Sequence, residues 1–173
     1  MRRALTIASS FLCLTAFLWC GDGAVFLRAS ANSARASIVT TIVLTVDSPV
    51  MLVDGVRTAL EVPPVIRNGR TLVPVRRVAE ALAATVTYVP SLRQVSIVRA
   101  DLSLSLAIGV PTAVMNGRSV SIDPADTRVV PMLSAGRTMV PLRFLAESLG
   151  STVSYEPRSR TITIVWRHTD GGS

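Results

Sequence analysis

The sequence of 173 residues contains no lysine, two cysteines and one histidine, and only 5% of its residues are aromatic. A transition-metal site usually needs several histidine, cysteine or carboxylate ligands close together, and His168 stands alone in a stretch that we expect to be an exposed tail. Cys13 and Cys20 both lie within the first 31 residues, so a chain cut after residue 31 has neither a disulfide nor thiol chemistry. We therefore expect no metal and no cofactor.

Residues 1–31 are typical of an export signal. Arg2 and Arg3 supply a positive start, and residues 4–19 form an apolar run without charge. Residues 29–31 read Ala-Ser-Ala, which fits a cleavage site with small residues. An uncleaved N-terminal anchor is the alternative, although the run is short for a spanning helix. We therefore expect a protein that is secreted, or held at the cell surface if the signal is not cleaved.

All 18 basic residues are arginine, and the formal net charge is +7. Removing residues 1–31 takes away three arginines and one aspartate, which leaves 15 arginines against 10 acidic residues, or +5. A basic exported protein suits anionic surroundings such as a cell-wall polymer or a membrane surface. Nucleic acid is not expected as a partner, because export points away from it and no basic run is interleaved with aromatic residues.

A long internal repeat organises the rest of the chain. Residues 69–98 recur at 136–165, an offset of 67, with 16 of the 30 positions identical. Each copy predicts a short strand, an amphipathic helix and a β-hairpin. The apolar helix positions are Val75, Val78, Ala79 and Leu82 in the first copy and Leu142, Leu145, Ala146 and Leu149 in the second. Pro74 and Pro141 are expected at the first helical position, where a missing N–H is tolerated.

The ends and surfaces of the two helices differ slightly in sequence. Gly150 follows the second helix, where a C-cap favours positive φ, and Ala83 stands at this position in the first copy. We expect the first copy to be the weaker half for this reason. Each helix also carries an arginine and a glutamate four residues apart, which we interpret as a surface ion pair rather than a catalytic pair. The pairs are Arg76 with Glu80 and Arg143 with Glu147.

A second, weaker register precedes each helix, at an offset of 62 residues. The matched residues are Leu44, Pro49 and Gly55 with Leu106, Pro111 and Gly117. Asp54-Gly55 and Asn116-Gly117 stand between β-prone runs and predict tight hairpins. The change of offset from 62 to 67 places a five-residue insertion within residues 124–130 of the second copy. We interpret the insertion as a surface loop, with a recognition loop as the alternative.

These patterns divide the chain into five segments. They are the signal 1–31, a linker and first strand 32–41, repeats 42–99 and 102–166, and a tail 167–173. The predicted fold class is α+β, with two tandem repeats, each a small antiparallel β-sheet with β-hairpins and one short amphipathic helix. One repeat of about 60 residues would be marginal alone, which favours two repeats that pack together or share strands.

The stretch at residues 63–82, Pro-Pro-Val-Ile-Arg-Asn-Gly-Arg-Thr-Leu-Val-Pro-Val-Arg-Arg-Val-Ala-Glu-Ala-Leu, resembles the copper amine oxidase N-terminal-like domain, also called the stalk domain. The second copy carries the same signature, and the resemblance covers about residues 42–166. Ala83, Tyr88 and Tyr155 depart from it, the last two because the family often has Trp there. The motif residues that we expect to be structural are Gly69, Arg70, Pro74, Arg76, Glu80, Gly136, Arg137, Pro141, Arg143, Glu147 and Gly150.

The resemblance implies an α+β module exported to the bacterial cell surface or medium, often beside catalytic or wall-binding domains. It does not imply copper, because in the oxidase this domain is an appendage remote from the metal and the quinone. The sequence context of a quinone-forming tyrosine is also absent around Tyr88 and Tyr155. We therefore expect a non-catalytic cell-envelope module for binding or scaffolding.

Two further possibilities remain open. A cell-wall polymer hydrolase is the alternative, with Glu80 and Glu147 or the loop carboxylates Asp123 and Asp126 as its acid and base. A structural module that binds an envelope protein through exposed strand edges is another. Arginines without a counterpart at the 67-residue offset are the candidate ligand contacts, since loops on a rigid sheet are frequent binding sites. They are Arg77, Arg99, Arg118, Arg128 and Arg158.

Overall fold

The computed structural model describes residues 37–100 and 102–169. The predicted signal, both cysteines and residues 170–173 of the predicted tail lie outside these ranges. Residues 35–173 belong to one compact unit. In the part of the chain that is described, no helix is long and apolar enough to cross a membrane.

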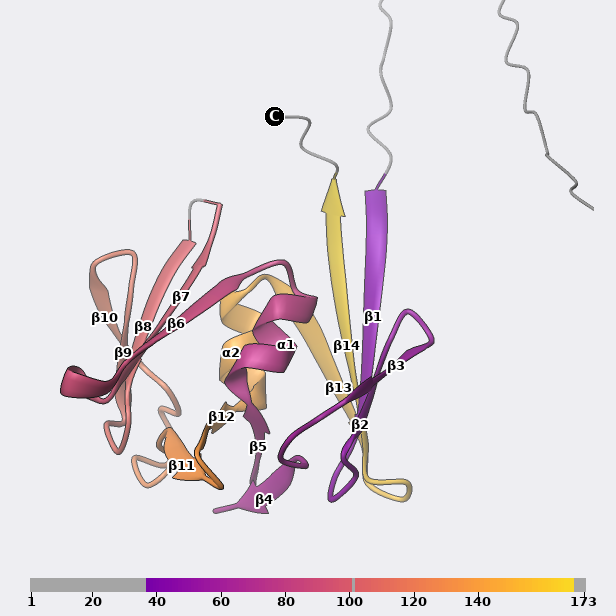
Figure 1. Cartoon of the computed structure of the whole chain (residues 1–173), viewed down its shortest axis with the longest axis horizontal. Helices are drawn as coiled ribbons and strands as arrows, with labels where there is room; N and C mark the ends of the chain where they lie inside the picture. Colours follow the sequence, from indigo (N-terminus) through magenta and orange to yellow (C-terminus); the bar gives the residue numbers. More distant parts are fainter. Residues whose placement is uncertain (1–36, 101, 170–173) are drawn as a thin grey trace, which may run out of the picture. The chain divides into compact units, whose positions relative to one another are not determined.

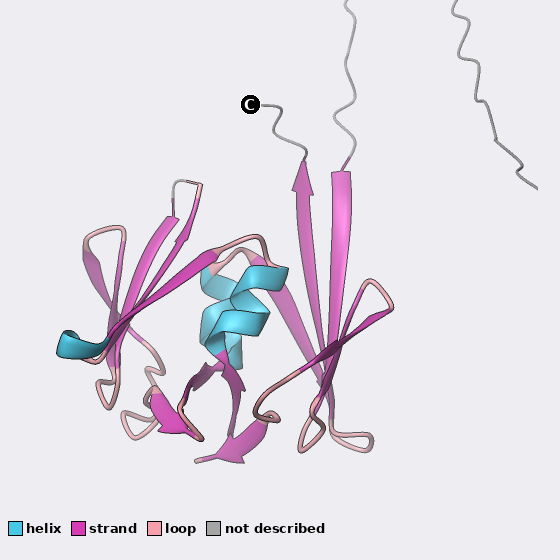
Figure 2. Ribbon diagram, viewed as in Figure 1, coloured by secondary structure: helices cyan, strands magenta, loops and turns pink. Residues whose placement is uncertain are grey.

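The described residues form three antiparallel sheets and two short α-helices, as expected for an α+β protein (Figures 1 and 2). The terminal sheet has the order β13 (Ser151–Glu156), β14 (Thr161–Thr169), β1 (Ser37–Thr45), β2 (Val50–Val53) and β3 (Val56–Ala59). The middle sheet has the order β10 (Arg118–Ser121), β9 (Thr112–Met115), β8 (Leu102–Ala107), β7 (Gln94–Arg99) and β6 (Thr85–Val89). The four-stranded sheet has the order β11 (Met132–Ser134), β12 (Arg137–Pro141), β5 (Arg70–Pro74) and β4 (Val65–Arg67).

Both five-stranded sheets contain strands from both sequence copies, which corrects the expectation of a separate sheet for each repeat. In the terminal sheet, β14 of the second copy pairs with β1 of the first, with Ile164 opposite Ile42. In the middle sheet, β7 of the first copy pairs with β8 of the second, with Ile97 opposite Leu104. A two-stranded hairpin is marginal alone, so each C-terminal hairpin gains stability by joining the three-stranded meander of the other copy.

The four-stranded sheet joins the copies through equivalent strands. Strands β5 and β12 pair with Val73 opposite Val140, two residues related by the 67-residue offset. The flanking pairs, Leu72 with Pro141 and Pro74 with Met139, exchange under the same offset. The Val73–Val140 pair therefore lies on an approximate two-fold axis, beside which α1 (Val75–Ala81) and α2 (Leu142–Ser148) contact each other. Figure 2 shows these helices between the two five-stranded sheets.

The helices bury the side chains that their periodicity predicts. The buried positions are Val75, Val78, Ala79 and Leu82 in and after α1, and Leu142, Leu145, Ala146 and Leu149 in and after α2. Pro74 and Pro141 do not stand at the first helical position but end β5 and β12 as N-caps, with ψ of 111° and 118°. Pairing of β5 with β12 holds both prolines extended, so each helix begins one residue later than predicted.

One main core serves both copies. Its fully buried side chains include Ile42 and Leu44 of β1, Ile97 of β7, Leu104 of β8 and Ile164 of β14. A smaller cluster of Val62, Leu72 and Met139 lies beneath the four-stranded sheet. Because the main core draws on both copies, we expect them to unfold together rather than as separate domains.

The strand ends follow the sequence in one place and depart from it in another. Asp54-Gly55 and Asn116-Gly117 form the predicted two-residue hairpin turns, with positive φ at all four residues. The predicted tail is instead strand as far as Thr169, because β14 stays paired with β1 up to Ser37. His168 is therefore not an exposed tail residue, and its ring stacks on Trp166 with centroids 3.8 Å apart.

Arg99, at the end of β7, links the C-terminal ends of both helices. Its guanidinium donates hydrogen bonds to the carbonyl of Leu82 (3.1 Å) and to that of Leu149 (2.6 Å). It also lies 4.8 Å from the ring centroid of Trp166, within the range of a cation–π contact. A charged donor at a helix C-terminus is stabilising, and here one group satisfies two helices.

Replacing Arg99 should therefore destabilise the whole unit. We expect Arg99→Ala to lower the free energy of unfolding by about 2–3 kcal/mol, because two buried carbonyls lose a charged donor. Arg118→Ala, on exposed strand β10, is the matched control and should change it by less than about 0.5 kcal/mol. Urea unfolding would measure both, and equal effects would contradict this role for Arg99.

The two helix ends also allow a direct comparison. Ala83 has φ of 57° and Gly150 has φ of 68°, so both stand in the left-handed region. A Cβ at Gly150 would meet only the Arg99 side chain, at 3.8 Å, so substitution there strains the backbone alone. We expect Ala83→Gly to stabilise and Gly150→Ala to destabilise, each by up to about 1 kcal/mol. Destabilisation by both changes in thermal unfolding would contradict this expectation.

Candidate functional site

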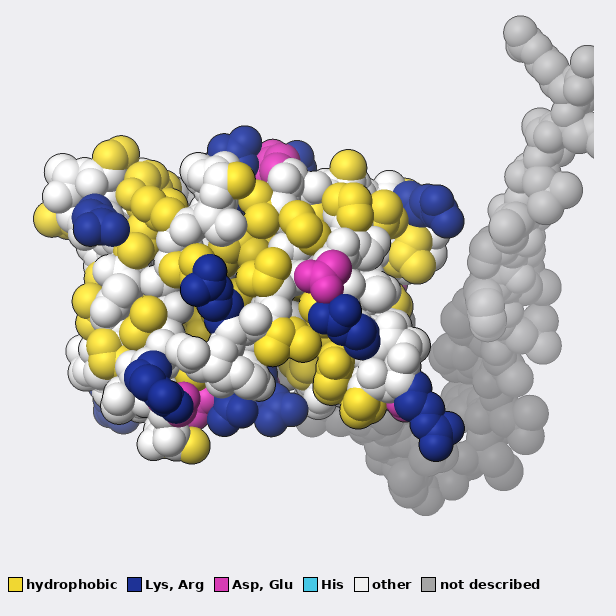
Figure 3. Space-filling view, turned by 90° about the horizontal axis from the view of Figure 1, so that it is seen from below, with side chains coloured by type: hydrophobic (Ala, Val, Ile, Leu, Met, Phe, Trp, Pro, Cys, Tyr) yellow, Lys and Arg dark blue, Asp and Glu magenta, His cyan; other side chains and the backbone are white. Residues whose placement is uncertain are grey.

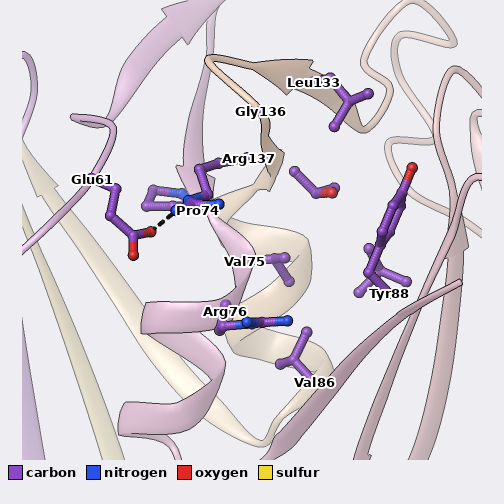
Figure 4. A pocket seen from close by; sticks show the side chains of 11 residues that line it. Glu61, Pro74, Val75, Arg76, Val86, Tyr88, Leu133, Gly136 and Arg137 are labelled. Atoms are coloured by element: carbon purple, nitrogen blue, oxygen red, sulfur yellow. Dashed lines mark hydrogen bonds and ion pairs between the residues drawn. The ribbon is translucent and has the colours of Figure 1, made fainter. Parts of the chain in front are cut away.

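Two clefts of similar construction lie beside the helices. Cleft 1 has a volume of about 200 Å³ and lies beside the start of α1 (Figure 4). Its walls come from α1, the β6–β7 hairpin and the β11–β12 turn. The lining residues are Glu61, Pro74, Val75, Arg76, Val86, Tyr88, Val95, Leu133, Gly136, Arg137 and Thr138.

Cleft 2 repeats this construction beside the start of α2, with a volume of about 150 Å³. Its lining residues are Ile66, Gly69, Arg70, Thr71, Leu142, Arg143, Val153, Tyr155 and Ile162. Each of these nine stands 67 residues from a residue that lines cleft 1. The helix and hairpin of each cleft come from one copy and the glycine turn comes from the other, so both clefts depend on the way the copies join.

One arginine in each cleft is held by a carboxylate of the opposite copy. In cleft 1, Nε of Arg137 donates to Oε2 of Glu61 at 2.8 Å, the contact drawn in Figure 4. In cleft 2, Nε of Arg70 donates to Oδ2 of Asp123 at 2.5 Å. Glu61 and Asp123 are themselves related by the 62-residue offset, so the two ion pairs are equivalent.

The two carboxylates nevertheless differ in their surroundings. The Glu61 side chain is 41% exposed, lines cleft 1 and also lies 3.4 Å from NH2 of Arg77. The Asp123 side chain is only 11% exposed and accepts a hydrogen bond from the backbone N–H of Ala125 at 2.9 Å. The hydrogen bond from Arg70 holds the pKa of Asp123 below its usual range, and Asp123 in turn raises the pKa of Arg70.

The inserted segment 124–130 is a loop anchored by its own contacts. Arg128 and Asp126 form a two-pronged ion pair, with both N–O distances at 2.9 Å, which lowers the pKa of Asp126 to about 2. The side chain of Asn68 donates to the carbonyl of Arg128, and Val129 is buried. The loop thus packs against the β4–β5 turn and begins directly after Asp123.

The five candidate arginines do not come together in one site. Arg77 lies against Glu61, Arg99 binds the helix ends and Arg128 is paired with Asp126. Arg118 lies in the middle sheet and Arg158 in the turn before β14 of the terminal sheet. Figure 3 shows arginine side chains as separate patches on that face rather than one basic surface. The sequence therefore pointed to the right residue type at the wrong positions.

The helix ion pairs are only partly formed. Arg143 lies 3.9 Å from Glu147, and both side chains are well exposed. The structure gives no contact within 4.0 Å between Arg76 and Glu80, which corrects the expectation that Arg76 is engaged there. Arg76 and Arg143 instead line equivalent positions in clefts 1 and 2.

The structural motif residues thus acquire a second role, since seven of them line the clefts. They are Gly69, Arg70, Pro74, Arg76, Gly136, Arg137 and Arg143. Sequence reasoning did not single out the exposed apolar rim formed by Ile66 and Tyr155 in cleft 2 and by Leu133 in cleft 1. The 67-residue offset that relates Tyr88 to Tyr155 and Ile66 to Leu133 was the available signal.

The chemistry available in the clefts is recognition of an anion beside apolar surface. An arginine fork can bind a carboxylate or a phosphate through two parallel hydrogen bonds. The carboxylates named for a hydrolase are poorly suited to general acid chemistry, because Asp123 and Asp126 have lowered pKa values, whereas a catalytic acid needs a raised one. Among the described residues, no group of three or more His, Cys, Asp and Glu side chains could hold a metal ion.

Comparison with known families agrees with the motif. Residues 30–97 and residues 52–164 both match the model of the family described as the copper amine oxidase N-terminal domain. This domain is non-catalytic in amine oxidases. No curated protein and no solved structure matched the chain.

The buried ion pair of cleft 2 should make stability depend on pH. Because the folded-state pKa of Asp123 lies below its unfolded value near 3.8, its stabilisation is present above about pH 4 and is lost as pH falls below it. We expect Asp123→Asn to lower the melting temperature at pH 7, and the difference from the native protein to shrink between about pH 4 and pH 2.

Glu61→Gln is the matched control for Asp123→Asn, because Glu61 holds the equivalent arginine but is more exposed. It should change the melting temperature less at every pH. Thermal unfolding followed by circular dichroism at several pH values would measure both variants. A pH-independent effect of Asp123→Asn would show that its carboxylate charge is not what stabilises the loop.

Proposed function

We propose that this chain, which belongs to the copper amine oxidase N-terminal domain family, is a non-catalytic module that binds an anionic polymer at the cell envelope. The observation that carries the proposal is the pair of equivalent clefts, each with two arginines beside an aromatic side chain. A site for acid–base catalysis has no reason to be duplicated with its whole structural context. Repeated recognition sites, in contrast, suit a polymer with repeated units, because a second contact strengthens the first.

The predicted export signal and the charge of the chain support the same proposal. A predicted mature charge of +5 favours approach to a negatively charged surface. Anionic cell-wall polymer is the partner that we propose, with the protein secreted or, if the signal remains, anchored at the cell surface. A scaffolding role is compatible with this, since sheet edges β3, β6, β10 and β13 remain open for a neighbouring envelope protein.

Binding to purified cell-wall fragments would test this function. We expect the protein to co-sediment with the fragments in 0.01 M salt and to be largely released in 0.1 M salt, because the screening length falls from about 30 Å to about 10 Å. Extraction of phosphate-bearing polymers from the fragments should weaken binding as well.

A matched control is the same experiment with vesicles of anionic lipid, which separates the wall polymer from a membrane surface. Wall binding that ignores both salt and extraction would contradict the proposal. It would point instead to a neutral glycan or a protein partner held by packing and neutral hydrogen bonds.

A further inference from the structure

We infer that the two clefts are unequal, and that cleft 2 is an open site for a sugar unit that carries a phosphate or carboxylate group. This inference rests on the proposed function and names the ligand class and the site within it. Cleft 1 has the same architecture, but its own Glu61 holds the position next to the arginines that a ligand anion would take.

The difference begins with the residues that line the clefts. Cleft 1 is lined by Arg76 and Arg137 together with the carboxylate of Glu61. Among the described residues that line cleft 2, Arg70 and Arg143 are charged and none is acidic. An incoming anion therefore meets a like charge in cleft 1 and only arginines on the walls of cleft 2.

The inserted loop explains why cleft 2 is free of acid. Asp123 is the equivalent of Glu61, but its side chain is drawn into the loop by the N–H of Ala125 and is only 11% exposed. Its shorter side chain still reaches Nε of Arg70, at 2.5 Å, and this leaves the two terminal amino groups of that guanidinium for another acceptor. Arg70 is thus held in place without its carboxylate entering the cleft.

The helix residue that follows the cleft arginine acts in the same direction. In cleft 1 it is Arg77, a second cation 3.4 Å from Glu61, which keeps this carboxylate beside the arginines. The equivalent residue at the 67-residue offset is Phe144, which packs against the core and offers no charge. In cleft 2, Arg143 is well exposed, and its distance of 3.9 Å from Glu147 is longer than a hydrogen bond.

The remaining walls of cleft 2 favour a sugar ring as the body of the ligand. Tyr155 is 41% exposed and Ile66 is 45% exposed, so an aromatic and an aliphatic face stand beside the arginines. The C–H face of a sugar can pack on such surfaces while its anionic group reaches the guanidinium. The volume of about 150 Å³ is below the roughly 300–1,000 Å³ of sites that enclose a whole small molecule, which suits one unit of a longer chain.

Titration calorimetry with defined oligosaccharides tests this inference. The probes are a short glucuronic acid oligomer, a short glucose oligomer linked by phosphodiesters, and a neutral glucose oligomer of equal length. We expect about one binding equivalent per chain for one or both acidic probes and none for the neutral one. Which acidic probe binds then identifies the source of the anion.

Equivalent substitutions in the two clefts provide the matched controls. Arg143→Gln should weaken binding by about tenfold or more, whereas Arg76→Gln should leave it within about twofold. Glu61→Gln should add a second binding equivalent by opening cleft 1, and combining it with Arg76→Gln should remove that gain. All four substituted side chains are exposed, and unchanged circular dichroism spectra would confirm folding of the variants.

Several outcomes would overturn the inference. They are equal losses in Arg76→Gln and Arg143→Gln, no loss in Arg143→Gln, binding of the neutral probe as tight as that of the acidic ones, or no binding of either acidic probe. Co-sedimentation of Arg143→Gln with wall fragments separates this failure from that of the proposed function. If the variant sediments as the native protein does, cleft 2 is not the site but wall binding stands. If the native protein does not sediment, the proposed function itself fails.

Discussion

The antiparallel pairing of β5 with β12 is the contact on which the rest of this structure depends. It places Val73 opposite Val140, on an approximate two-fold axis, and holds the two copies in fixed register. From this axis the C-terminal hairpin of each copy reaches the N-terminal meander of the other, as β7 with β8 and as β14 with β1. A hairpin alone buries too little apolar surface to be stable, so neither copy completes its sheets without its partner.

This exchange of strands places the clefts at the boundary between the copies. The glycine turns before β5 and β12 approach the helix and hairpin of the opposite copy, and a cleft forms at each approach. The ion pairs Arg70–Asp123 and Arg137–Glu61 cross the same boundary. Structural and recognition roles thus fall on the same motif residues, because the arginines that follow the turns both join the copies and line the clefts.

The five-residue insertion is the main departure from symmetry. It follows the carboxylate at position 123, and its backbone supplies a hydrogen bond that the equivalent Glu61 does not receive. A loop tolerated on the surface can in this way change the charge inside a neighbouring cleft without altering a strand. Arg99 shows a second departure, since this single residue binds both helix ends while its counterpart, Trp166, offers an aromatic face.

Much of the fold could be read from local patterns. The 3.6-residue period identified the buried faces of α1 and α2, and Asp54-Gly55 and Asn116-Gly117 identified two hairpin turns, because both signals depend on neighbours in sequence. Gly150 likewise indicated a helix end with positive φ, and Ala83 adopts the same conformation despite its Cβ. The repeat itself, and with it the family, followed from identical residues at a fixed offset.

Only the tertiary structure decided which strands pair and which side chains meet. A period of two residues marks a strand but carries no information about its partner, so the sharing of sheets between copies was invisible in the sequence. For the same reason Arg76 could be assigned to Glu80 on helical spacing, although long-range packing places it in cleft 1. The ion pair of Arg70 with Asp123 spans 53 residues, and that of Arg137 with Glu61 spans 76. Contacts at such separations depend on how the two copies join, and this is settled by burial of a common core rather than by any local motif.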